Sequence, residues 1–424
     1  MIARLFRKGG LRYVLAFADQ GLNALLSLGV TLWLIRRGSA EQLGTYVFWA
    51  NTVLVIGTFI TAFTSVHIYR LPPTSGRYAT ERAILSANLT MAALATLLTL
   101  AVVPLLGHPL GLYAAAAFVP GIVIGLHARA VATARGEMGS AAAISAVPFV
   151  AVLAVVVAEA WLGAPPSVPL LLLVNGLSQG VAGIVIILRL CGPGAADFSA
   201  SARRRWRVLA RRSGWSLLAG MANETFTRLY IFMVFAWFGA PALATLTAAQ
   251  TMLRPATLLA GAFGSAARGP LASRRHAGDT HGFLKLLVLG GTAPAIITLV
   301  LGGLIAALWP WVSAWLYAGR YAGLENVVLL WSVVMAISCF WVAGLAGLQS
   351  LARLRSLAIA EVGGAITCAI AMPPLLWLLA PPGALVAIII GGCVQVALLA
   401  YGVLKGLQAL GHRRRRVTLG AGAG

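Results

Sequence analysis

Acidic residues are scarce in this sequence. Only 10 of the 424 residues are Asp or Glu, against 32 Lys or Arg, and charged residues make up 10% of the chain. Hydrophobic residues make up 60%, and the mean hydropathy is +0.90. A soluble domain of this length needs far more polar surface, so the composition indicates an integral membrane protein. The apolar runs are continuous and about 20 residues long, which excludes the short alternating strands of a transmembrane β-barrel.

Cysteine and histidine are also rare. The four cysteines (Cys191, Cys339, Cys368 and Cys393) stand in or beside apolar segments without paired spacing. We interpret them as packing residues, not as disulfides or metal ligands. The six histidines are scattered, and the chain has no HExxH, no CxxC and no Walker-type glycine loop. The sequence therefore predicts no metal, no cofactor and no ATP hydrolysis by this chain.

A net charge of +22 raises the possibility of a nucleic-acid partner. The basic residues, however, cluster between apolar runs at one set of helix ends, as membrane topology requires, and not on a soluble face. We therefore expect membrane lipids, and no nucleic acid, around this protein.

Twelve apolar segments are long enough to cross a bilayer as helices. The first is too long for the apolar core of a signal peptide and lacks a cleavage site of small residues, so it counts as a spanning helix. The segments are roughly residues 13–35, 44–69, 83–106, 112–134, 140–162, 168–190, 214–238, 243–267, 285–310, 325–350, 356–380 and 384–404.

The distribution of positive charge tests this topology. With a cytoplasmic N-terminus, all but five of the 32 Lys and Arg residues fall on the cytoplasmic side. Arg36, Arg37 and Arg320 fall outside, and Arg228 and Arg254 fall within the membrane. The sequence predicts an all-α polytopic protein of twelve transmembrane helices, with both termini in the cytoplasm.

The longest polar break divides the chain into two halves of six helices. We expect an N-terminal six-helix bundle at 1–190, a basic cytoplasmic linker at 191–212, a C-terminal six-helix bundle at 213–404 and a basic cytoplasmic tail at 405–424. An even number of helices in each half implies parallel repeats around an axis along the membrane normal. This predicts a transporter-like architecture with a central cavity between the two bundles.

The strongest functional signal lies in residues 223–254, two apolar segments joined by a short Gly-Ala-Pro turn. An arginine near the middle of a membrane helix costs about 2.5–3.5 kcal/mol even on the mildest scale, and usually faces a cavity or the bundle interior. Polar residues at a spacing of four share one helix face. The candidate residues are Asn223, Glu224, Arg228, Gln250 and Arg254.

The first half carries a weaker polar group in Asp19, Asn23 and Asn51. If the halves pack about a pseudo-twofold axis, helices one, two, seven and eight line one cavity. Arg228 and Arg254 would make its middle cationic and suited to phosphate or another anion. Because proline lacks an N–H group, the Pro after Arg254 predicts a kink beside that arginine.

Structural interpretations of these residues remain open. Glu224 and Arg228 could form an internal salt bridge, and Arg254 could pair with Asp19 for packing. For Gln250, Asn51 and Asn23, an interhelical contact worth about 0.6 kcal/mol is at least as probable as substrate binding. Asp19 and Glu224 are the candidates for proton or cation coupling, since carboxyl groups in the membrane are costly to keep charged. Glu361 is interpreted as a solvated partner of nearby arginines.

Residues 17–53 resemble the opening of the polysaccharide-unit flippases, a family of the multidrug, oligosaccharidyl-lipid and polysaccharide exporter superfamily. That opening has an Asp-Gln pair near the inner end of helix one, followed by a turn of the type G-S/P-x-E-x-[FL]-G-x-Y. The matching residues here are Gly38, Ser39, Glu41, Leu43, Gly44 and Tyr46. The resemblance implies two six-helix bundles in a V around a central cavity.

The resemblance also implies a function. It is the translocation of undecaprenyl-pyrophosphate-linked oligosaccharide across the bacterial inner membrane, for O-antigen, exopolysaccharide or other surface polysaccharide biosynthesis. A polysaccharide polymerase and its chain-length machinery would be partners. Arg228 and Arg254 fit as ligands of the diphosphate or an acidic sugar on the residue argument alone.

Two other functions compete. A drug/cation antiporter of the same superfamily is disfavoured by a cationic cavity, since only Asp19 and Glu224 could bind a cationic drug. A membrane glycan polymerase or ligase would need a substantial extramembrane loop, whereas the longest expected outer loop is roughly residues 311–324. The sequence therefore favours a transporter over an enzyme.

Overall fold

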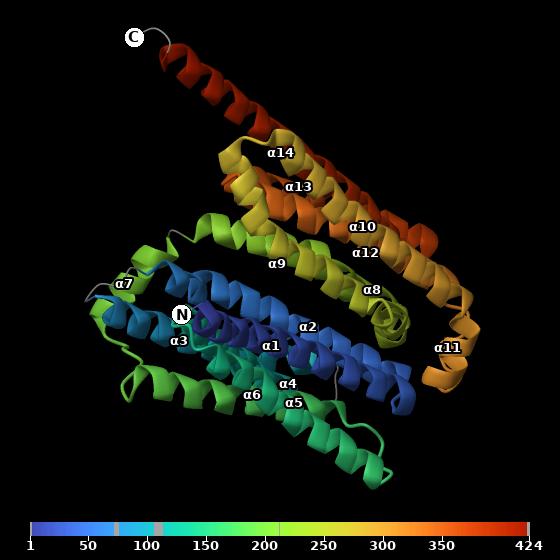
Figure 1. Cartoon of the computed structure of the whole chain (residues 1–424). Helices are drawn as coiled ribbons and strands as arrows, with labels where there is room; N and C mark the ends of the chain where they lie inside the picture. The colour runs from blue at the N-terminus through green and yellow to red at the C-terminus, as the bar shows by residue number, and fades with distance from the viewer. Residues whose placement is uncertain (1, 72–75, 106–112, 212, 422–424) are drawn as a thin grey trace. The chain divides into compact units, whose positions relative to one another are not determined.

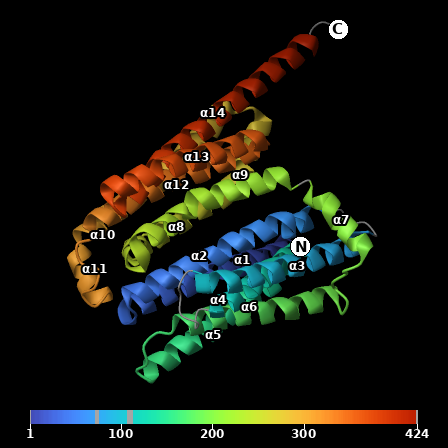
Figure 2. The same ribbon diagram turned by 180° about the vertical axis from the view of Figure 1, so that it is seen from behind.

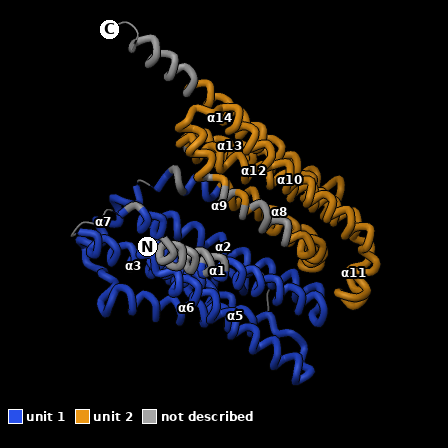
Figure 3. Tube along the Cα trace, viewed as in Figure 1, with its two compact units in different colours: residues 1–221 blue, residues 222–424 orange. Residues whose placement is uncertain are grey.

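The computed structural model describes residues 2–71, 76–105, 113–211 and 213–421. It divides into two compact units, residues 1–221 and 222–424 (Figure 3). In the described ranges the secondary structure is helical throughout. The proposed division into two bundles, a linker and a tail is a finer one than these two units.

The first unit holds the first seven α-helices and the start of the eighth (Figure 1). α4 is its central helix and packs against α2, α3, α5, α6 and a 3₁₀ helix, η1. The elements are α1 (Ile2–Arg37), α2 (Ala40–Phe63), η1 (Ser65–Arg70), α3 (Arg77–Leu105), α4 (Ala114–Ala134), α5 (Met138–Trp161), α6 (Val168–Cys191), α7 (Ala200–Ala210) and α8 (Gly214–Thr251).

Two glycines bring α4 and α6 together. A Cβ atom on Gly121 would overlap the carbonyl oxygen of Gly176, and one on Gly176 would lie 2.5 Å from the Cα atom of Phe118. The helix backbones therefore touch, which only residues without a side chain permit. Figure 2, seen from behind, shows the same close pairing of α4 and α6.

The turn that carries the family resemblance is a helix cap. Ser39 precedes α2, and its hydroxyl accepts a hydrogen bond from the Gln42 backbone N–H at 3.1 Å. The Gln42 side chain accepts one in return from the Ser39 N–H at 2.8 Å. This reciprocal pair satisfies backbone donors that the first turn of a helix leaves open. A Cβ atom on Gly38 would lie 2.7 Å from the Leu34 carbonyl oxygen, which explains glycine before the cap.

The second unit is built around α12, which packs against α9, α10, α13 and α14. Its apolar core includes Phe283 of α10 and Leu399 of α14. The elements after α8 are α9 (Arg254–Ala277), α10 (Thr280–Ala307), α11 (Trp309–Leu316), α12 (Glu325–Ser350), α13 (Leu354–Leu379) and α14 (Pro382–Ala421).

The predicted break after residue 238 is confirmed: Gly239, with a φ of 78° and a ψ of 178°, is a non-helical kink inside α8. The predicted span 243–267 differs from the structure, because α8 ends at Thr251. A new helix, α9, begins at Arg254. The expectation of one helix over 243–267 is therefore wrong: the chain breaks beside Arg254, where the following proline has no N–H group to continue the helix. α1 and α14 also extend beyond the predicted bounds.

Ten helices in the described ranges are long and apolar enough to cross a membrane. α8 is one of these, although it covers the seventh predicted span and part of the eighth. The protein is thus an all-helical, multi-pass membrane protein. The twelve-span arrangement and the cytoplasmic termini remain predictions.

Candidate functional sites in the two units

In the first unit, a buried polar cluster joins α1, α4 and α5. Asp19 is 6% exposed and lies 3.4 Å from Nη2 of Arg129. The Ser145 hydroxyl donates to Asp19 Oδ1 and accepts from Arg129 Nη2 at 2.7 Å. Asn23 Nδ2 donates to Ser145 Oγ at 2.7 Å and to the Asp19 carbonyl oxygen at 3.0 Å. Three helices are therefore tied together by one network of charge and hydrogen bonds.

The cluster borders a cavity of about 320 Å³ lined by α1, α2, α4 and α6. Its apolar lining includes Leu26, Leu54 and Ile122, and its polar side chains are those of Gln20, Asn23, Ser27, Arg129, Asn175 and Gln179. Arg129 Nε is buried and has no hydrogen-bond partner within the described part of the chain. The Arg129 side chain as a whole is 22% exposed and lines the polar cavity, where a guanidinium can bind an anionic oxygen.

The predicted site residues of this unit, Asp19, Asn23 and Asn51, differ in how they relate to the cavity. Asp19 and Asn23 do come together, as their spacing of four implies, and Asn23 lines the cavity. Asn51 follows the cavity-lining Ala50 and donates to the Val47 carbonyl oxygen at 2.7 Å. The ion-pair partner that the structure gives Asp19 is Arg129, from the same unit. The alternative pairing of Asp19 with Arg254 joins residues of different units and stays a prediction.

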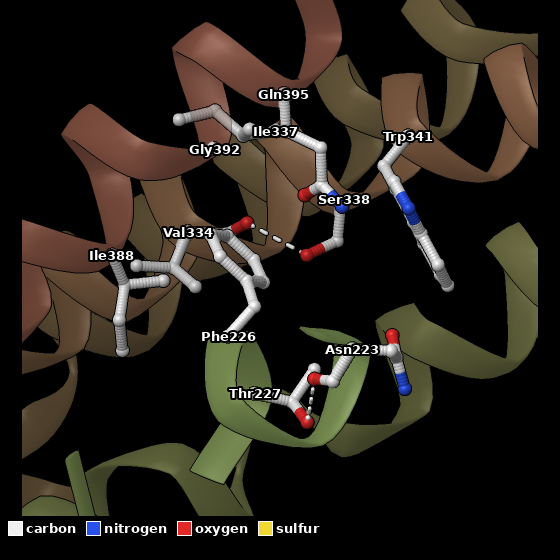
Figure 4. Close-up of a pocket in the computed structure, with 10 residues that line it drawn as sticks. All are labelled: Asn223, Phe226, Thr227, Val334, Ile337, Ser338, Trp341, Ile388, Gly392 and Gln395. Carbon is white, nitrogen blue, oxygen red and sulfur yellow. Dashed lines mark hydrogen bonds between the residues drawn. The ribbon is translucent and has the colours of Figure 1, made fainter. Parts of the chain in front are cut away.

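In the second unit, Glu224 and Arg228 form the salt bridge that their spacing of four predicts. Glu224 is 7% exposed, and the bond runs from Arg228 Nε to Glu224 Oε2. The neighbouring Asn223 lines a small cavity of about 60 Å³ between α8, α12 and α14 (Figure 4). Figure 4 shows Asn223 and Thr227 on one side of this cavity, and Ser338 and Trp341 of α12 on another.

Tyr230 connects the remaining predicted residues. Its hydroxyl donates to Gln250 Oε1 at 3.5 Å, across the bend of α8. Its ring packs edge-on against Trp331 at 5.4 Å, and Trp331 in turn donates to the Leu246 carbonyl oxygen. The charges of Arg254 and Arg228 both act on the Tyr230 phenol. The structure thus places the two predicted arginines around one buried tyrosine.

Tyr317, directly after α11, contacts the second half of α8. Its hydroxyl donates to the Ala248 carbonyl oxygen at 2.9 Å, and its ring packs on Trp309 at 5.6 Å. Burial raises the pKa of Tyr317 above its ordinary value, with the nearby Arg254 charge opposing the shift. The phenol therefore stays neutral and acts as a donor that fixes the second half of α8.

Glu361 is a site residue whose setting differs from the expectation. It is 4% exposed, and its carboxylate accepts hydrogen bonds from Trp341 Nε1 at 2.8 Å and Gln395 Nε2 at 2.6 Å. The interpretation of Glu361 as a solvated partner of arginines is wrong. Trp341 and Gln395 also line the small cavity of Figure 4, so the carboxylate is hydrogen-bonded to two residues of the cavity lining.

Comparisons with known proteins concern the fold. No family model and no curated protein matches this sequence. Solved structures do match. The lipid II flippase MurJ in an inward closed conformation superposes with a TM-score of 0.68 at 12% identity, over 94% of this chain and 89% of that one. An inward-facing multidrug resistance MATE family transporter of the MOP superfamily has a TM-score of 0.64 at 12% identity, over 94% and 99%.

This chain shares its fold with these two proteins. A third structure supports it, a MOP superfamily transporter from Pyrococcus furiosus described as having a binding pocket of reverse polarity. Its TM-score is 0.59 at 14% identity over 95% of each chain. These three structures are described as a flippase and two transporters.

The sequence did not predict Arg129 and Tyr230 as site residues, and it did not predict that Glu361 is buried and hydrogen-bonded to neutral donors. Arg129 was assigned to a cytoplasmic helix end, and it lies in the last turns of α4 with its side chain at the cavity. The available signal was Gln179 of α6, a polar residue inside an apolar span that borders the same cavity. Gln395 also stands alone in an apolar run, and the hydrogen-bond partners of Tyr230 and Gln395 lie 20 and 34 residues away.

Proposed function

We propose that this protein is a flippase that moves undecaprenyl-pyrophosphate-linked oligosaccharides across the bacterial inner membrane for cell-surface polysaccharide biosynthesis. The observation that supports the proposal is an arginine among the apolar helices of each unit: Arg129 at a polar cavity in the first, and Arg228 and Arg254 near Tyr230 in the second. A diphosphate needs donors of this kind on its path, because a guanidinium binds phosphate oxygens through paired N–H groups.

The proposed substrate contacts divide by chemistry. Arg228 and Arg254 hold the diphosphate, and Arg129 adds a third cationic contact. Asparagine and glutamine amides can both donate to and accept from sugar hydroxyls. On this proposal the sugar contacts are Asn23, Asn51, Asn223 and Gln250. The lipid tail stays in the bilayer, where its burial costs nothing.

Coupling to an ion is proposed at carboxylates. Asp19 and Glu224 were selected for this role, and each has an arginine partner, Arg129 and Arg228 respectively. Glu361 has only neutral donors among the described residues. A buried carboxylate without a positive partner is costly when charged, so binding a proton or a monovalent cation stabilises it. Glu361 therefore joins Asp19 and Glu224 as a coupling candidate.

A drug/cation antiporter is the second candidate, because multidrug transporters of the MATE family share this fold. Buried carboxylates such as Asp19 are what a cationic drug would require. On the flippase proposal, a polysaccharide polymerase and chain-length machinery consume the translocated product.

The test is a flipping assay in proteoliposomes with a fluorescent undecaprenyl-pyrophosphate oligosaccharide. Wild type is compared with Arg254→Gln and with the double variant Glu224→Gln/Arg228→Gln, which removes both partners of the salt bridge and leaves no unpaired charge. Arg320→Gln, in the predicted outer loop, is the matched control. Uptake of a cationic dye against an imposed proton or sodium gradient is measured in parallel.

Flipping by wild type and the control, with at least a tenfold loss in both cavity variants, supports the flippase and its cationic site. Flipping at wild-type rates in both variants contradicts the assignment of Arg228 and Arg254 while keeping the function. Dye uptake without flipping of lipid-linked glycans overturns the flippase in favour of the antiporter.

A further inference from the structure

The short helix α7 is anchored to the first unit at three points. Trp206 Nε1 donates to the Phe63 carbonyl oxygen at 3.0 Å. Before the helix, the Ser86 hydroxyl of α3 donates to the Asp197 carbonyl oxygen at 2.6 Å. After it, Ser213 Oγ and His67 Nε2 form a buried hydrogen bond at 2.8 Å. The connection between α6 and α8 is thus fixed in place on α2, α3 and η1.

None of these anchors uses the arginines of α7. At 100° per residue, Arg203, Arg204 and Arg207 fall within an arc of about 100° on the helix surface. Ala202, on the opposite side, is buried, and the half-buried Trp206 lies at the edge of the arc with its Nε1 hydrogen-bonded to Phe63. All three arginines are exposed, and within the described ranges they make no hydrogen bond or ion pair. This charged stripe is therefore available to a partner.

Beside the stripe runs a groove of about 190 Å³ between α3 and α7. Its lining is almost wholly apolar: Ala87, Thr90, Met91 and Leu94 of α3, with Phe198 and Trp206. Arg203 also lines it, so the charged stripe meets the groove at that residue. Leu94 is 61% exposed and Phe198 59%, and α3 continues outward with Leu97 and Leu98, 62% and 64% exposed.

We propose that this groove binds an anionic phospholipid of the leaflet that faces α7, with its phosphate at Arg203 and Arg207 and one acyl chain along Met91 and Leu94. The apolar surface of a membrane-spanning helix faces acyl chains, which makes a lipid the occupant that the groove and the stripe fit together. The guanidinium groups pair with phosphate oxygens, and an apolar tail removes exposed leucine from water.

The site has a consequence for transport that does not depend on which substrate is carried. α7 lies in the connection between α6 and α8, the helix within which the chain passes from the first unit to the second. A lipid held at Arg203 would fix this connection to the bilayer surface. The rate of transport should then change with the anionic lipid content of the membrane. The lipid would act through a site separate from the arginines proposed for the substrate.

The test is native mass spectrometry of delipidated full-length protein titrated with phosphatidylglycerol or with phosphatidylcholine of the same acyl chains. Arg203→Gln is compared with Arg205→Gln, an exposed arginine on the same helix about 160° around from it. Thr90→Phe fills the groove without changing charge; Thr90 is exposed, so the substitution leaves the core intact. Inorganic phosphate at the lipid concentration is the probe for head-group chemistry alone.

We expect tighter binding of phosphatidylglycerol than of phosphatidylcholine to wild type, and about a fivefold weaker affinity in Arg203→Gln. Arg205→Gln should change it by less than twofold, and Thr90→Phe should weaken binding of both lipids. Equal losses in the two arginine variants would overturn the site, because the attraction would then be diffuse. Displacement of the lipid by inorganic phosphate would overturn the lipid as occupant.

Discussion

The Asp19 carboxylate lies 3.4 Å from Nη2 of Arg129, and the Ser145 hydroxyl bridges the two. The contact joins α1 to α4 at the edge of the polar cavity of the first unit. Because Arg129 also lines that cavity, the same pair contributes to folding and to the proposed anion path.

Arg129→Gln should destabilise the protein more than the double variant Asp19→Asn/Arg129→Gln. The single change leaves a buried carboxylate without its cation. We expect a loss of about 2 kcal/mol, below the roughly 3–5 kcal/mol of a fully buried pair because Arg129 keeps partial exposure. The free energy of unfolding is measured by titration with a denaturing detergent. Additive effects of the two single variants in the double-mutant cycle would mean that the pair is not coupled.

Gly121→Ala should severely reduce the amount of folded protein. The added methyl group would overlap the carbonyl oxygen of Gly176, and neither helix backbone can move without disturbing α4, the centre of the first unit. We expect a cost of about 3 kcal/mol or more. The readout is monodisperse protein after detergent extraction. Gly29→Ala, at an exposed position of α1 with open space around it, is the control and should be neutral or stabilising.

Glu361→Gln should leave folding nearly unchanged and abolish the dependence of transport on a proton or sodium gradient. Glutamine keeps the shape of the carboxylate and can still accept from Trp341, but it binds neither a proton nor a cation. Transport is measured in proteoliposomes with and without each gradient. Glu41→Gln, at the exposed start of α2, is the control. A variant that responds to the gradients like wild type would exclude Glu361 from coupling.

Tyr317→Phe should lower the free energy of unfolding by about 1 kcal/mol, because it removes one buried hydrogen bond, to the Ala248 carbonyl oxygen. The second half of α8 would lose a fixed point next to Arg254. Tyr321→Phe is the matched control, since within the described ranges its hydroxyl makes no hydrogen bond. Equal stability of the two variants would show that the Tyr317 bond contributes nothing.

Local sequence signals predicted much of the fold. Apolar length predicted most of the helices, and the spacing of Glu224 and Arg228 predicted their salt bridge. The Gly-Ser turn before α2 formed where the family resemblance placed it, as a capping box. The break beside Arg254 was expected as a kink, but the chain stops at Thr251 and starts a new helix. A proline limits which backbone hydrogen bonds can form, and the packing around it decides whether the helix only kinks or ends.

The membership of the candidate sites was less predictable. Arg129 stands 110 residues from Asp19 in the sequence, and counting charges placed it at a helix end. Glu361, Trp341 and Gln395 come from α13, α12 and α14, so no spacing rule relates them. Hydrogen bonds between helices depend on how those helices rotate and pack, which no single segment encodes.

Composition and the lengths of the apolar runs determined by themselves that this is a helical, multi-pass membrane protein with few charges inside the membrane, since each such charge is costly in lipid. Only the tertiary structure decided which groups surround each charge. Arg129 pairs with Asp19, and Arg228 and Arg254 lie near Tyr230. Glu361 accepts from two neutral donors. Local patterns fix the helices, and packing selects their partners because a side chain reaches only what the neighbouring helices bring within a few ångströms.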